Sequence, residues 1–563
     1  MKILNVFSLI ILLVGFNLNA QNFEWARTFG GTGDDNGNAI SVDAIGNVYT
    51  TGAFYGSADF DPGTGESILT SVGMRDIFIQ KLDALGNFQW AKSLGGLESD
   101  SPYAIEVDLS GNVYIAGIFQ GTADFDTGDG TLNLTSSGGM DAFVLKLDTS
   151  GNFLWAKTFG GTGLDVIYSM AVDPSGNIFS TGHFSGTVDF DPGSGTTILT
   201  TPGEFTNNTF VHKMDADGNF QWVKSFFGGA NWGTSINIDS AGSIYTTGML
   251  TGESDFDPGT GTELLNSNFA HGTYVQKMDS SGNFLWARSF AGSYNLHHSS
   301  SVVDGSGNVY TTGSFDFPAD FDPGPETETL TSGGNNDVFI QKMDSSGNFL
   351  WAKSFGGVCE FCADGGHAIV VDAVGNIYTG GFFSGVADFD PGNGTVNLTA
   401  VGNWDIFIQK LNANGEFIWA RTFGGTERDT GLDLDIDHSG SIYTTGYFTG
   451  TVDFDSGSGT ENHTSVGGWD IFVQKLSQPP LNLDEIDTFD LTLYPNPVQN
   501  ILNISMNQPI TSIAIIGMDG RLYHKQNLNS KIIQINLNNL PKGVYVVRIQ
   551  SGKTIQQKKF VKK

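Results

Sequence analysis

The stretch Gly151-Asn152-Phe153-Leu154-Trp155-Ala156-Lys157, with a Gly-Gly turn after it, decides the fold because it recurs along the chain. Its tryptophan returns at spacings of 64 to 68 residues, at Trp25, Trp90, Trp155, Trp222, Trp286, Trp351 and Trp419. A fixed period of this kind is typical of repeat architectures, in which each copy is one supersecondary unit. The sequence therefore predicts a repeat protein, and it says much less about activity.

Each copy carries four stretches with the patterns of β-strands. In the first copy they are Asn38–Asp43, Val48–Phe54, Asp76–Leu82 and Phe88–Leu94, separated by glycine turns and one longer excursion. The first two stretches are apolar or small on both faces, which is typical of sheets covered on both sides. Each second stretch also holds one glycine, such as Gly52, which suggests that another group approaches closely there. The pattern predicts an all-β chain of four-stranded blades packed side by side.

The two ends of the array predict how it closes. The chain enters at Phe23–Arg27, which matches a fourth strand with no other strand before it. It leaves the array at Asp470–Lys475, which matches a third strand with no fourth strand after it. Pairing these segments would remove two exposed sheet edges. We predict a seven-bladed β-propeller over residues 21–477, closed by the N-terminal strand, with an open solenoid as the alternative.

The repeated residues resemble the bacterial SBBP family, which is named for its seven-bladed β-propeller repeats. The family signature of Val-Asp, a short turn, Gly-Asn-Val-Tyr and Thr-Gly stands here as Val42-Asp43, Gly46-Asn47-Val48-Tyr49 and Thr51-Gly52. The resemblance extends over all seven copies. It implies the propeller fold, and it implies no activity.

The net charge of −33 is unevenly distributed. Residues 491–563 hold ten Lys and Arg against the single acid Asp519, whereas the rest of the chain holds 17 basic and 59 acidic residues. Most of those 17 recur at two positions of each copy, so they do not form the one-sided basic patch that nucleic acid binding needs. We expect a monomeric propeller with no nucleic acid partner.

Residues 1–20 have the pattern of a secretory signal peptide, with Lys2, the apolar run Leu9–Val14 and a small residue at Ala20. No later stretch is long and apolar enough to span a bilayer, so no transmembrane anchor is expected. Residues 478–492, which include Pro479-Pro480, are expected to form a linker.

Residues 493–563 are expected to form a second domain. They resemble the C-terminal type A sorting domain of the type IX secretion system through Tyr494-Pro495-Asn496-Pro497, Gly543-x-Tyr545 and the late Lys558-Lys559. The resemblance implies a small Ig-like β-sandwich that engages the type IX secretion machinery and carries the protein across the outer membrane. The product would be secreted or held at the cell surface. An ordinary small β-domain that stabilises the propeller is the alternative.

Each copy inserts Asp-Phe-Asp and a glycine turn between its second and third strands. The aspartates are Asp59, Asp61, Asp124, Asp126, Asp189, Asp191, Asp255, Asp257, Asp320, Asp322, Asp388, Asp390, Asp453 and Asp455. In an extended segment the two carboxylates lie on one face and the phenylalanine on the other. Such a pair could begin a Ca²⁺ site, which needs about six to eight oxygen ligands. Alternatively, the carboxylates accept hydrogen bonds from turn amides or pair with the repeated lysines.

The loops that lead from one copy into the next differ most between copies. Their distinctive side chains are Asp34, Asp35, Glu98, Asp100, Asp165, Trp232, His297, His298, Asp364, Glu427, Arg428 and Asp429. Because variable loops on a rigid frame usually carry function, these residues are predicted to form a ligand rim. Solvated turns are the alternative.

The only cysteines, Cys359 and Cys362, are predicted to form a local disulfide outside the cytoplasm. Zinc is a weaker interpretation because His367 is the only further ligand nearby. The sequence contains no Gly-x-Ser-x-Gly elbow, and no catalytic residue is assigned.

Together these features favour an exported, non-catalytic β-propeller that binds a glycan or a protein. A secreted polysaccharide hydrolase or lyase with its site in the propeller funnel is one alternative. A purely structural surface or matrix protein is another.

Overall fold

The computed structural model describes residues 22–203, 206–293, 299–358, 362–477, 492–517, 522–551 and 554–563. The chain divides into two compact units, Met1–Gln478 and Pro479–Lys563. The predicted signal peptide and nearly all of the predicted linker lie outside the described residues. The secondary structure of the described residues consists of strands, so the all-β class is confirmed.

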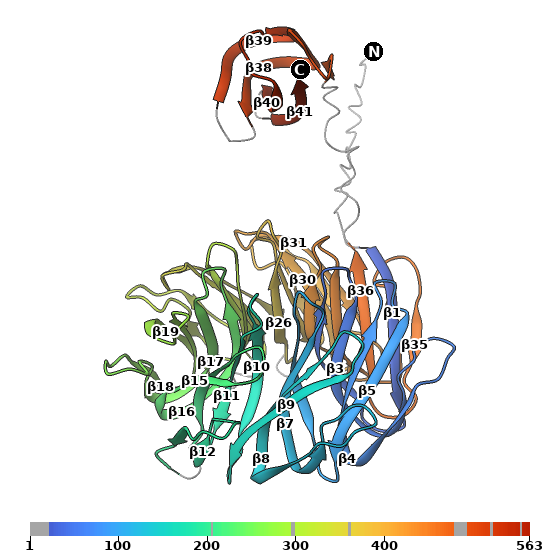
Figure 1. Ribbon diagram of the computed structural model, residues 1–563, viewed down its shortest axis with the longest axis vertical. Coiled ribbons are helices and arrows are strands. Elements are labelled where there is room, and N and C mark those ends of the chain that lie inside the picture. Colours follow the sequence, from blue (N-terminus) through green and yellow to red (C-terminus); the bar gives the residue numbers. More distant parts are fainter. Residues whose placement is uncertain are drawn as a thin grey trace, which may run out of the picture. The chain divides into compact units, whose positions relative to one another are not determined.

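The larger unit is built of groups of four antiparallel strands (Figure 1). The first strands are β2 (Asn36–Val42), β6 (Ser101–Val107), β10 (Val166–Val172), β16 (Phe227–Ile238), β20 (Ser300–Val303), β26 (Gly365–Val371) and β32 (Thr430–Ile436). The second strands are β3 (Val48–Asp59), β7 (Val113–Asp124), β11 (Ile178–Phe184), β17 (Ile244–Asp255), β21 (Val309–Phe315), β27 (Ile377–Phe383) and β33 (Ile442–Phe448). The third strands are β4 (Ile68–Leu82), β8 (Asn133–Leu147), β14 (Asn208–Met214), β18 (Leu264–Met278), β24 (Asp337–Met343), β30 (Asp405–Leu411) and β36 (Asp470–Ser477). The fourth strands are β5 (Phe88–Gly96), β9 (Phe153–Gly161), β15 (Phe220–Ser225), β19 (Phe284–Ser293), β25 (Phe349–Gly357), β31 (Phe417–Phe423) and β1 (Asn22–Gly31).

The N-terminal strand β1 pairs with β36 from the far end of the array, and the two lie side by side in Figure 1. Phe23 lies opposite Leu476, and Phe29 lies opposite Ile471. Because β36 also pairs with β33, and β33 with β32, these four strands form a group like the others. The two segments that had no partner in their own copies therefore lie beside each other.

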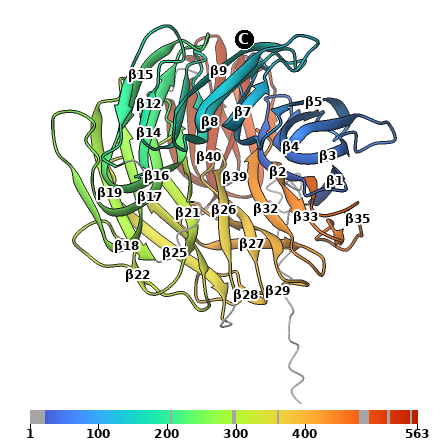
Figure 2. The same cartoon turned by 90° about the horizontal axis from the view of Figure 1, so that it is seen from below.

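Neighbouring groups touch through their first strands. β2 contacts β6, β6 contacts β10, and the same succession continues through β16, β20, β26 and β32, which in turn contacts β2. In Figure 2 the first strands that carry labels, β2, β16, β26 and β32, lie towards the middle of the larger unit, while strands such as β5, β15 and β19 lie at its periphery.

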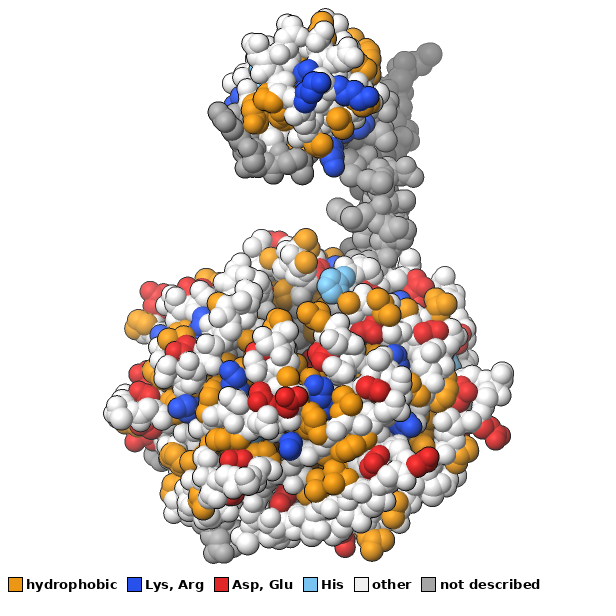
Figure 3. Space-filling view, in the orientation of Figure 1, with side chains coloured by type: hydrophobic (Ala, Val, Ile, Leu, Met, Phe, Trp, Pro, Cys, Tyr) orange, Lys and Arg blue, Asp and Glu red, His pale blue; other side chains and the backbone are white. Residues whose placement is uncertain are grey.

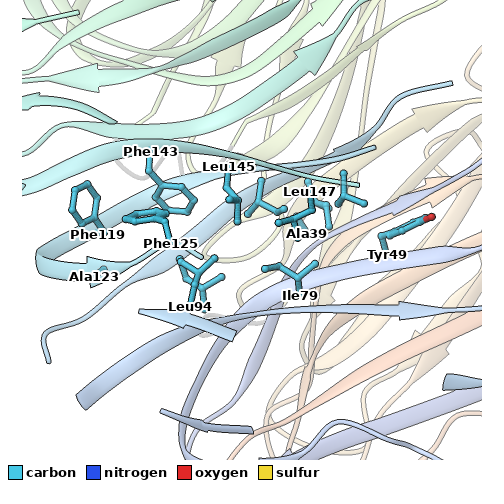
Figure 4. Packing of buried hydrophobic residues seen from close by; sticks show 14 residues of the cluster. Ala39, Tyr49, Ile79, Leu94, Phe119, Ala123, Phe125, Phe143, Leu145 and Leu147 are labelled. Atoms are coloured by element: carbon cyan, nitrogen blue, oxygen red, sulfur yellow. The ribbon is translucent and has the colours of Figure 1, made fainter. Parts of the chain in front are cut away.

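The hydrophobic core lies between adjacent groups. In the cluster of Figure 4, Ile79 and Leu94 of one group are buried against Phe119, Phe143 and Leu145 of the next. A corresponding cluster joins residues of β1 and β36 to residues of β3 and β4. Both faces of each sheet are thus covered, which is why the strands are apolar on both sides.

The repeated phrase joins one group to the next. The turn glycine Gly86 has a φ of +77°, and a Cβ placed on it would lie 2.9 Å from the ring of Trp25. Arg27 Nε donates a hydrogen bond to the carbonyl oxygen of Gly86 at 2.9 Å. Gly151 has the same relation to Trp90. The phrase recurs because each copy needs both the left-handed turn and the space for the ring.

The repeated lysines lie over aromatic rings. Lys81 Nζ lies 4.9 Å from the ring centre of Tyr49 and donates to the carbonyl oxygen of Thr149 at 3.2 Å. Lys475 likewise donates to the carbonyl oxygen of Ala84 at 3.2 Å, which links the last group to the first. The proposed pairing of these lysines with the Asp-Phe-Asp carboxylates is therefore not what the described residues show.

The segment between the second and third strands of each copy forms a further hairpin that extends both strands. The predicted strands ended before this extension. β3 continues to Asp59 and β4 begins at Ile68, and these two residues lie opposite each other. In other groups the extension is a separate pair: β12 (Thr187–Asp189) with β13 (Ile198–Thr200), β22 (Ala319–Asp320) with β23 (Thr329–Leu330), β28 (Val386–Asp388) with β29 (Asn397–Thr399), and β34 (Thr451–Asp453) with β35 (Asn462–Thr464).

The C-terminal unit is one hydrogen-bonded sheet around its own apolar core. Its strands are β37 (Thr492–Tyr494), β38 (Ile501–Gly517), β39 (Leu522–Asn536), β40 (Gly543–Ser551) and β41 (Thr554–Lys562). The long β38 pairs with β37, β39 and β40, and β40 pairs with β41. The Ig-like sandwich stays a prediction.

Candidate functional site

A pocket of about 990 Å³ is lined mainly by the first strands of the groups in the larger unit. Residues from β2, β6, β10, β16, β20, β26 and β32 all contribute to its wall. Because strands from every group converge on it, a ligand in this pocket would touch residues far apart in the sequence.

β-Bulges aim side chains into this pocket. The pairing of β2 with β3 shifts between Gly37 and Ala39, so that Asn38 is the extra residue. The bulge residues that line the pocket are Asn38, Tyr103, Tyr168, Thr234, His367 and Leu432. A bulge redirects a side chain, and here it directs a residue that differs between copies.

The same bulge explains the glycine in each second strand. A Cβ on Gly52 would collide with the carbonyl oxygen of Asn36, which lies just before the bulge. Gly182 has the same relation to the carbonyl oxygen of Val166. The close approach inferred from the sequence is therefore that of the neighbouring first strand.

One side of the pocket carries a row of aromatic rings. The ring centres of Tyr103 and Tyr168 lie 5.2 Å apart, and those of Tyr168 and His183 lie 5.5 Å apart. The ring of Trp232 follows 5.8 Å from that of His183. Burial lowers the pKa of His183 to about 4, so its imidazole is a neutral ring at physiological pH. Tyr103, Tyr168 and Trp232 line the pocket, each half-buried.

A second aromatic group lines the pocket from β26, β27 and the loop before β30. The ring centres of His367 and Phe382 lie 5.3 Å apart, and those of Phe382 and Trp404 lie 4.4 Å apart. The guanidinium of Arg428 lies 4.5 Å from the ring centre of Trp404. Of the aromatic residues in these two groups, only Trp232 was predicted for the ligand rim, and His367 was named only as a weak zinc ligand.

Several pocket residues carry buried polar atoms without a hydrogen-bond partner among the described residues. They are Nε1 of Trp232, Oδ1 of Asn336 and Oγ1 of Thr430. A buried polar group without a partner is unfavourable, so these three atoms lower the stability of the pocket wall.

Three acids face the pocket from β6 and β32. Asp433 accepts a hydrogen bond from the Ile40 amide at 2.9 Å, and Asp435 accepts one from the Val42 amide at 2.8 Å. Glu106 is half-buried nearby, and burial, followed by the charges of Asp435 and Asp433, raises its pKa to about 8. The two aspartates thus tie β32 to β2.

The predicted rim separates into buried and exposed residues. Asp35 is buried, and its carboxylate accepts the amide hydrogens of Gly31 at 2.7 Å and Tyr55 at 2.9 Å. The residues that bridge two segments in the same way are Asp100, Asp165, Asp364 and Asp429. These five described aspartates hold the loops in place and do not line the pocket.

The remaining predicted rim residues have other positions. The exposed ones are Asp34, Glu98, Glu427 and Arg428. Trp232 lines the pocket, and its part in a ligand rim stays a prediction. His297 and His298 lie outside the described residues.

Each buried bridging aspartate has an acidic neighbour on a third strand. Asp76 Oδ2 accepts the Val72 amide at 2.8 Å, while its buried Oδ1 has no partner among the described residues. Burial raises the pKa of Asp76 to about 6. Burial, with a smaller contribution from the charge of Asp76, raises the pKa of Asp100 to about 7.

The Asp-Phe-Asp carboxylates accept hydrogen bonds from their own turn. Asp59 Oδ1 accepts the amides of Asp61 at 3.0 Å and Ser67 at 2.8 Å, and Asp61 Oδ1 accepts that of Gly63 at 2.8 Å. Phe60 is fully buried between them. No group of three or more His, Cys, Asp or Glu side chains in the described ranges is placed to hold a metal ion. The calcium site stays a prediction.

Cys362 is buried and disulfide-bonded. Cys359, the other cysteine of the sequence, lies outside the described residues. His367, the weak zinc ligand candidate, is instead hydrogen-bonded through Nδ1 to the carbonyl oxygen of Gly431 at 3.0 Å and lines the pocket.

The sorting motif residues join the two ends of the C-terminal unit. Asn496 accepts the Val561 amide at 2.9 Å, which fastens the Tyr494-Pro495-Asn496-Pro497 opening to the last strand. Tyr545 donates to the carbonyl oxygen of Pro541 at 2.9 Å and stacks on Phe560. Gly543 pairs with Lys562, while Lys558 and Lys559 are exposed on β41.

Charge is distributed over the larger unit without a basic patch on the face shown in Figure 3. There, single Lys and Arg side chains are separated by Asp, Glu and apolar ones. No helix in the described part of the chain is long and apolar enough to cross a membrane.

Residues 492–563 match the family described as secretion system C-terminal sorting domain. This match indicates that the protein is secreted or displayed at the cell surface and that it interacts with the type IX secretion machinery through this domain. The role of residues 1–20 in export stays a prediction.

Two curated proteins are similar to parts of the chain. The uncharacterized WD repeat-containing protein L264 of Acanthamoeba polyphaga mimivirus is 24% identical over 504 residues, which cover 75% of this chain and 36% of L264. The regulatory protein FlaEY of Caulobacter vibrioides is 26% identical over 161 residues, which cover 28% of this chain and 16% of FlaEY. The chain therefore spans only a minor part of either relative.

Among solved structures, PorZ, an essential surface component of the type IX secretion system of Porphyromonas gingivalis, aligns at 12% identity and a TM-score of 0.24. That alignment covers 96% of this chain and 100% of PorZ. A protein of unknown function from Dyadobacter fermentans aligns at 11% identity and a TM-score of 0.34, over 68% of this chain and 95% of that protein. At these TM-scores the likenesses carry no argument about function.

Proposed function

We propose that the protein is an exported, non-catalytic binding scaffold. Its larger unit would be a seven-bladed β-propeller of the SBBP type, closed by β1, with a glycan or protein ligand entering the axial pocket. The pairing of β1 with β36 and the succession of contacts from β2 round to β32 support the closed ring. The WD repeats in the name of the mimiviral relative support it as well, since WD repeats form propeller blades.

The observation that carries the proposal is a constant frame with variable residues at one position. The strand glycine, the tryptophan clamp and the lysine contact recur from copy to copy, while the bulge residue changes from Asn38 to Tyr103 and His367. A scaffold with only a structural role gains nothing from aiming different side chains at one pocket. A binding protein needs such differences, because ligands are recognised by a few polar and aromatic groups in a concave site.

The test is binding by the mature full chain. We expect a signal on a glycan array or specific retention of a defined surface protein, and we expect it to weaken when Tyr103 and His367 are both replaced by Ala. If the chain binds no glycan on the array and no surface protein, with and without Ca²⁺, the binding scaffold is wrong and a purely structural role is favoured.

A polysaccharide hydrolase is the second candidate, and Glu106 is the observation that favours it. Its carboxyl faces the pocket and has a raised pKa, as a general acid requires. Against this candidate, Asp433 and Asp435 are engaged by backbone amides. Glycan cleavage by the full chain, abolished in Glu106→Gln with binding retained, would establish the enzyme in place of the scaffold.

A further inference from the structure

We propose that the axial pocket binds a neutral oligosaccharide, with pyranose rings stacked on its aromatic side chains. This inference rests on the proposed binding function and names the ligand class. A pyranose ring presents a face of C–H groups and a rim of hydroxyl groups, so it needs flat apolar surfaces together with hydrogen-bonding atoms. The pocket offers both.

The flat surfaces come from two aromatic groups contributed by different parts of the chain. Tyr103, Tyr168 and Trp232 form part of the first row, and Phe382 and Trp404 belong to the second group. His183 lies between Tyr168 and Trp232 and, being neutral, supports the row without adding charge. Aromatic rings supply large contact areas with little loss of side-chain entropy, which suits them to ligand stacking.

Between these surfaces the pocket is lined by polar side chains that are only half-buried, among them Asn38, Thr234 and Asn237. Amide and hydroxyl side chains both donate and accept hydrogen bonds. A ligand that matches them must donate and accept hydrogen bonds at several points. Sugar hydroxyls do both, whereas a purely apolar ligand would form none of these hydrogen bonds.

Charge selects among saccharides. Glu106, Asp433 and Asp435 face the same pocket, and the chain outside its C-terminal unit is strongly acidic. Burial raises the pKa of Glu106 to about 8, so it is protonated at neutral pH, whereas Asp435, with a pKa of about 6, is ionised. A uronate or sulfated sugar would bring a second negative charge beside Asp435, which is unfavourable in a partly desolvated site. The ligand is therefore neutral.

Size favours an oligosaccharide. The pocket volume of about 990 Å³ is at the upper end of the roughly 300–1,000 Å³ range of small-molecule sites. A short saccharide chain has several ring faces and can therefore stack on both aromatic groups.

Calorimetric titration of the mature full chain tests the proposal. The probes are cellohexaose, maltohexaose and chitohexaose as neutral saccharides, and hexagalacturonate as an anionic one. We expect at least one neutral hexasaccharide to bind and hexagalacturonate to fail. Trp232→Ala and Trp404→Ala should each weaken binding about tenfold or more, as loss of a central aromatic contact does. Trp404→Phe, which keeps a ring, should retain most of the affinity.

The matched control is Trp90→Ala. Trp90 is also half-buried and contacts an aromatic ring, that of Tyr49 at 6.3 Å, and neither of these two residues lines the pocket. Binding should survive this change, and thermal unfolding of all variants verifies that they are folded. If an alanine variant does not fold, Tyr103→Phe replaces it in the titration. This change removes only a hydroxyl group from the pocket and should weaken binding of the neutral hexasaccharide.

The outcomes separate this inference from the proposed function. If no neutral hexasaccharide binds while the chain still binds a protein or an anionic glycan, the saccharide inference is wrong and the scaffold stands. The inference also fails if Trp232→Ala and Trp404→Ala bind as the unaltered chain does. If the chain binds nothing, both proposals fall.

Discussion

At the scale of single residues, the turn glycines show how one position meets two requirements. Gly86 and Gly56 both have positive φ, +77° and +67°. A Cβ on Gly86 would press on the ring of Trp25, whereas a Cβ on Gly56 would meet nothing within 4 Å. A comparison of alanine substitutions at these two glycines therefore distinguishes the cost of backbone strain from the cost of lost ring packing.

We predict that Gly86→Ala destabilises the larger unit more than Gly56→Ala. The left-handed backbone alone should cost about 1–2 kcal/mol in either variant. Displacement of the Trp25 ring should add about 1–3 kcal/mol in Gly86→Ala. Denaturant unfolding of the full chain measures the difference, and equal losses in the two variants would show that the ring contact contributes nothing.

The buried aspartate pairs are the second feature at this scale. Asp76 and Asp100 have raised pKa values, but the equivalent positions of another group hold Asn208 and Asn231. Asn208 donates to the carbonyl oxygen of Phe226, and Asn231 donates to Ser254 Oγ. The fold thus accepts a neutral amide at both positions.

Stability should consequently fall as the pH rises. A carboxyl whose pKa is higher in the folded state binds its proton more tightly there, so its contribution is complete below the ordinary value of 3.8. The contribution is lost as the pH rises through about 6 to 7, the folded values of Asp76 and Asp100. Thermal unfolding should therefore occur at a lower temperature at pH 8 than at pH 5.

The double variant Asp76→Asn/Asp100→Asn should unfold a few degrees higher than the unaltered chain at pH 8, and the gain should shrink at pH 5. Glu66→Gln/Asp129→Asn, at two exposed sites, controls for the loss of two charges. An increase in unfolding temperature that is the same at both pH values would contradict the raised pKa values of Asp76 and Asp100.

At the scale of elements, the Asp-Phe-Asp segment closes a hairpin with its own side chains. Asp59 accepts two turn amides, and Gln80 donates to the carbonyl oxygen of Phe60 at 2.6 Å. Each hairpin thus gains acceptors for its turn amides and a buried ring, which is reason enough for the segment to recur.

We predict that Asp59→Ala costs about 1–3 kcal/mol, because two amides lose their acceptor. Asp59→Asn keeps an acceptor oxygen and should cost less. Adding Ca²⁺ should leave the unfolding temperature of the unaltered chain unchanged. A rise in that temperature that Asp59→Asn abolishes would instead establish the calcium site.

At the scale of the whole molecule, the proposed ring depends on β1 and β36. Asn22 and Ser477 lie directly opposite each other at the outer end of this pair. Directly opposed residues of antiparallel strands are about 4.5–5.5 Å apart at Cα, within reach of a disulfide.

Asn22→Cys/Ser477→Cys should form a cross-link on oxidation and stabilise the unit by about 2–5 kcal/mol, since the loop that it closes is very long. The cross-link is detected by mass spectrometry, and the stabilisation by unfolding with and without reductant. Asn22→Cys alone is the control. Failure of the two cysteines to join, or a cross-link that destabilises, would mean that the ends do not meet in solution.

Much of the architecture was predictable because its signals are local and repeated. The recurring tryptophan, the strand patterns and the two incomplete ends indicated an all-β repeat array. The Pro-Asn-Pro opening and the late Gly-x-Tyr indicated the sorting domain, which the match over residues 492–563 bears out. Each of these signals lies within a few neighbouring residues.

The candidate site was only partly predictable. The sequence placed Asp34 and Asp35 together, yet one is exposed and the other is buried as a bridge between two segments. Tyr103 and Trp404 carried no local signal, since a bulge and a loop from separate groups bring them to one pocket.

The sequence by itself determined the all-β repeat pattern and the export signal at the C-terminus, because periodic patterns and terminal motifs act over short stretches of chain. Only the tertiary structure decided which side chains line the pocket, because burial and β-bulge geometry depend on neighbours that the chain brings together from distant copies.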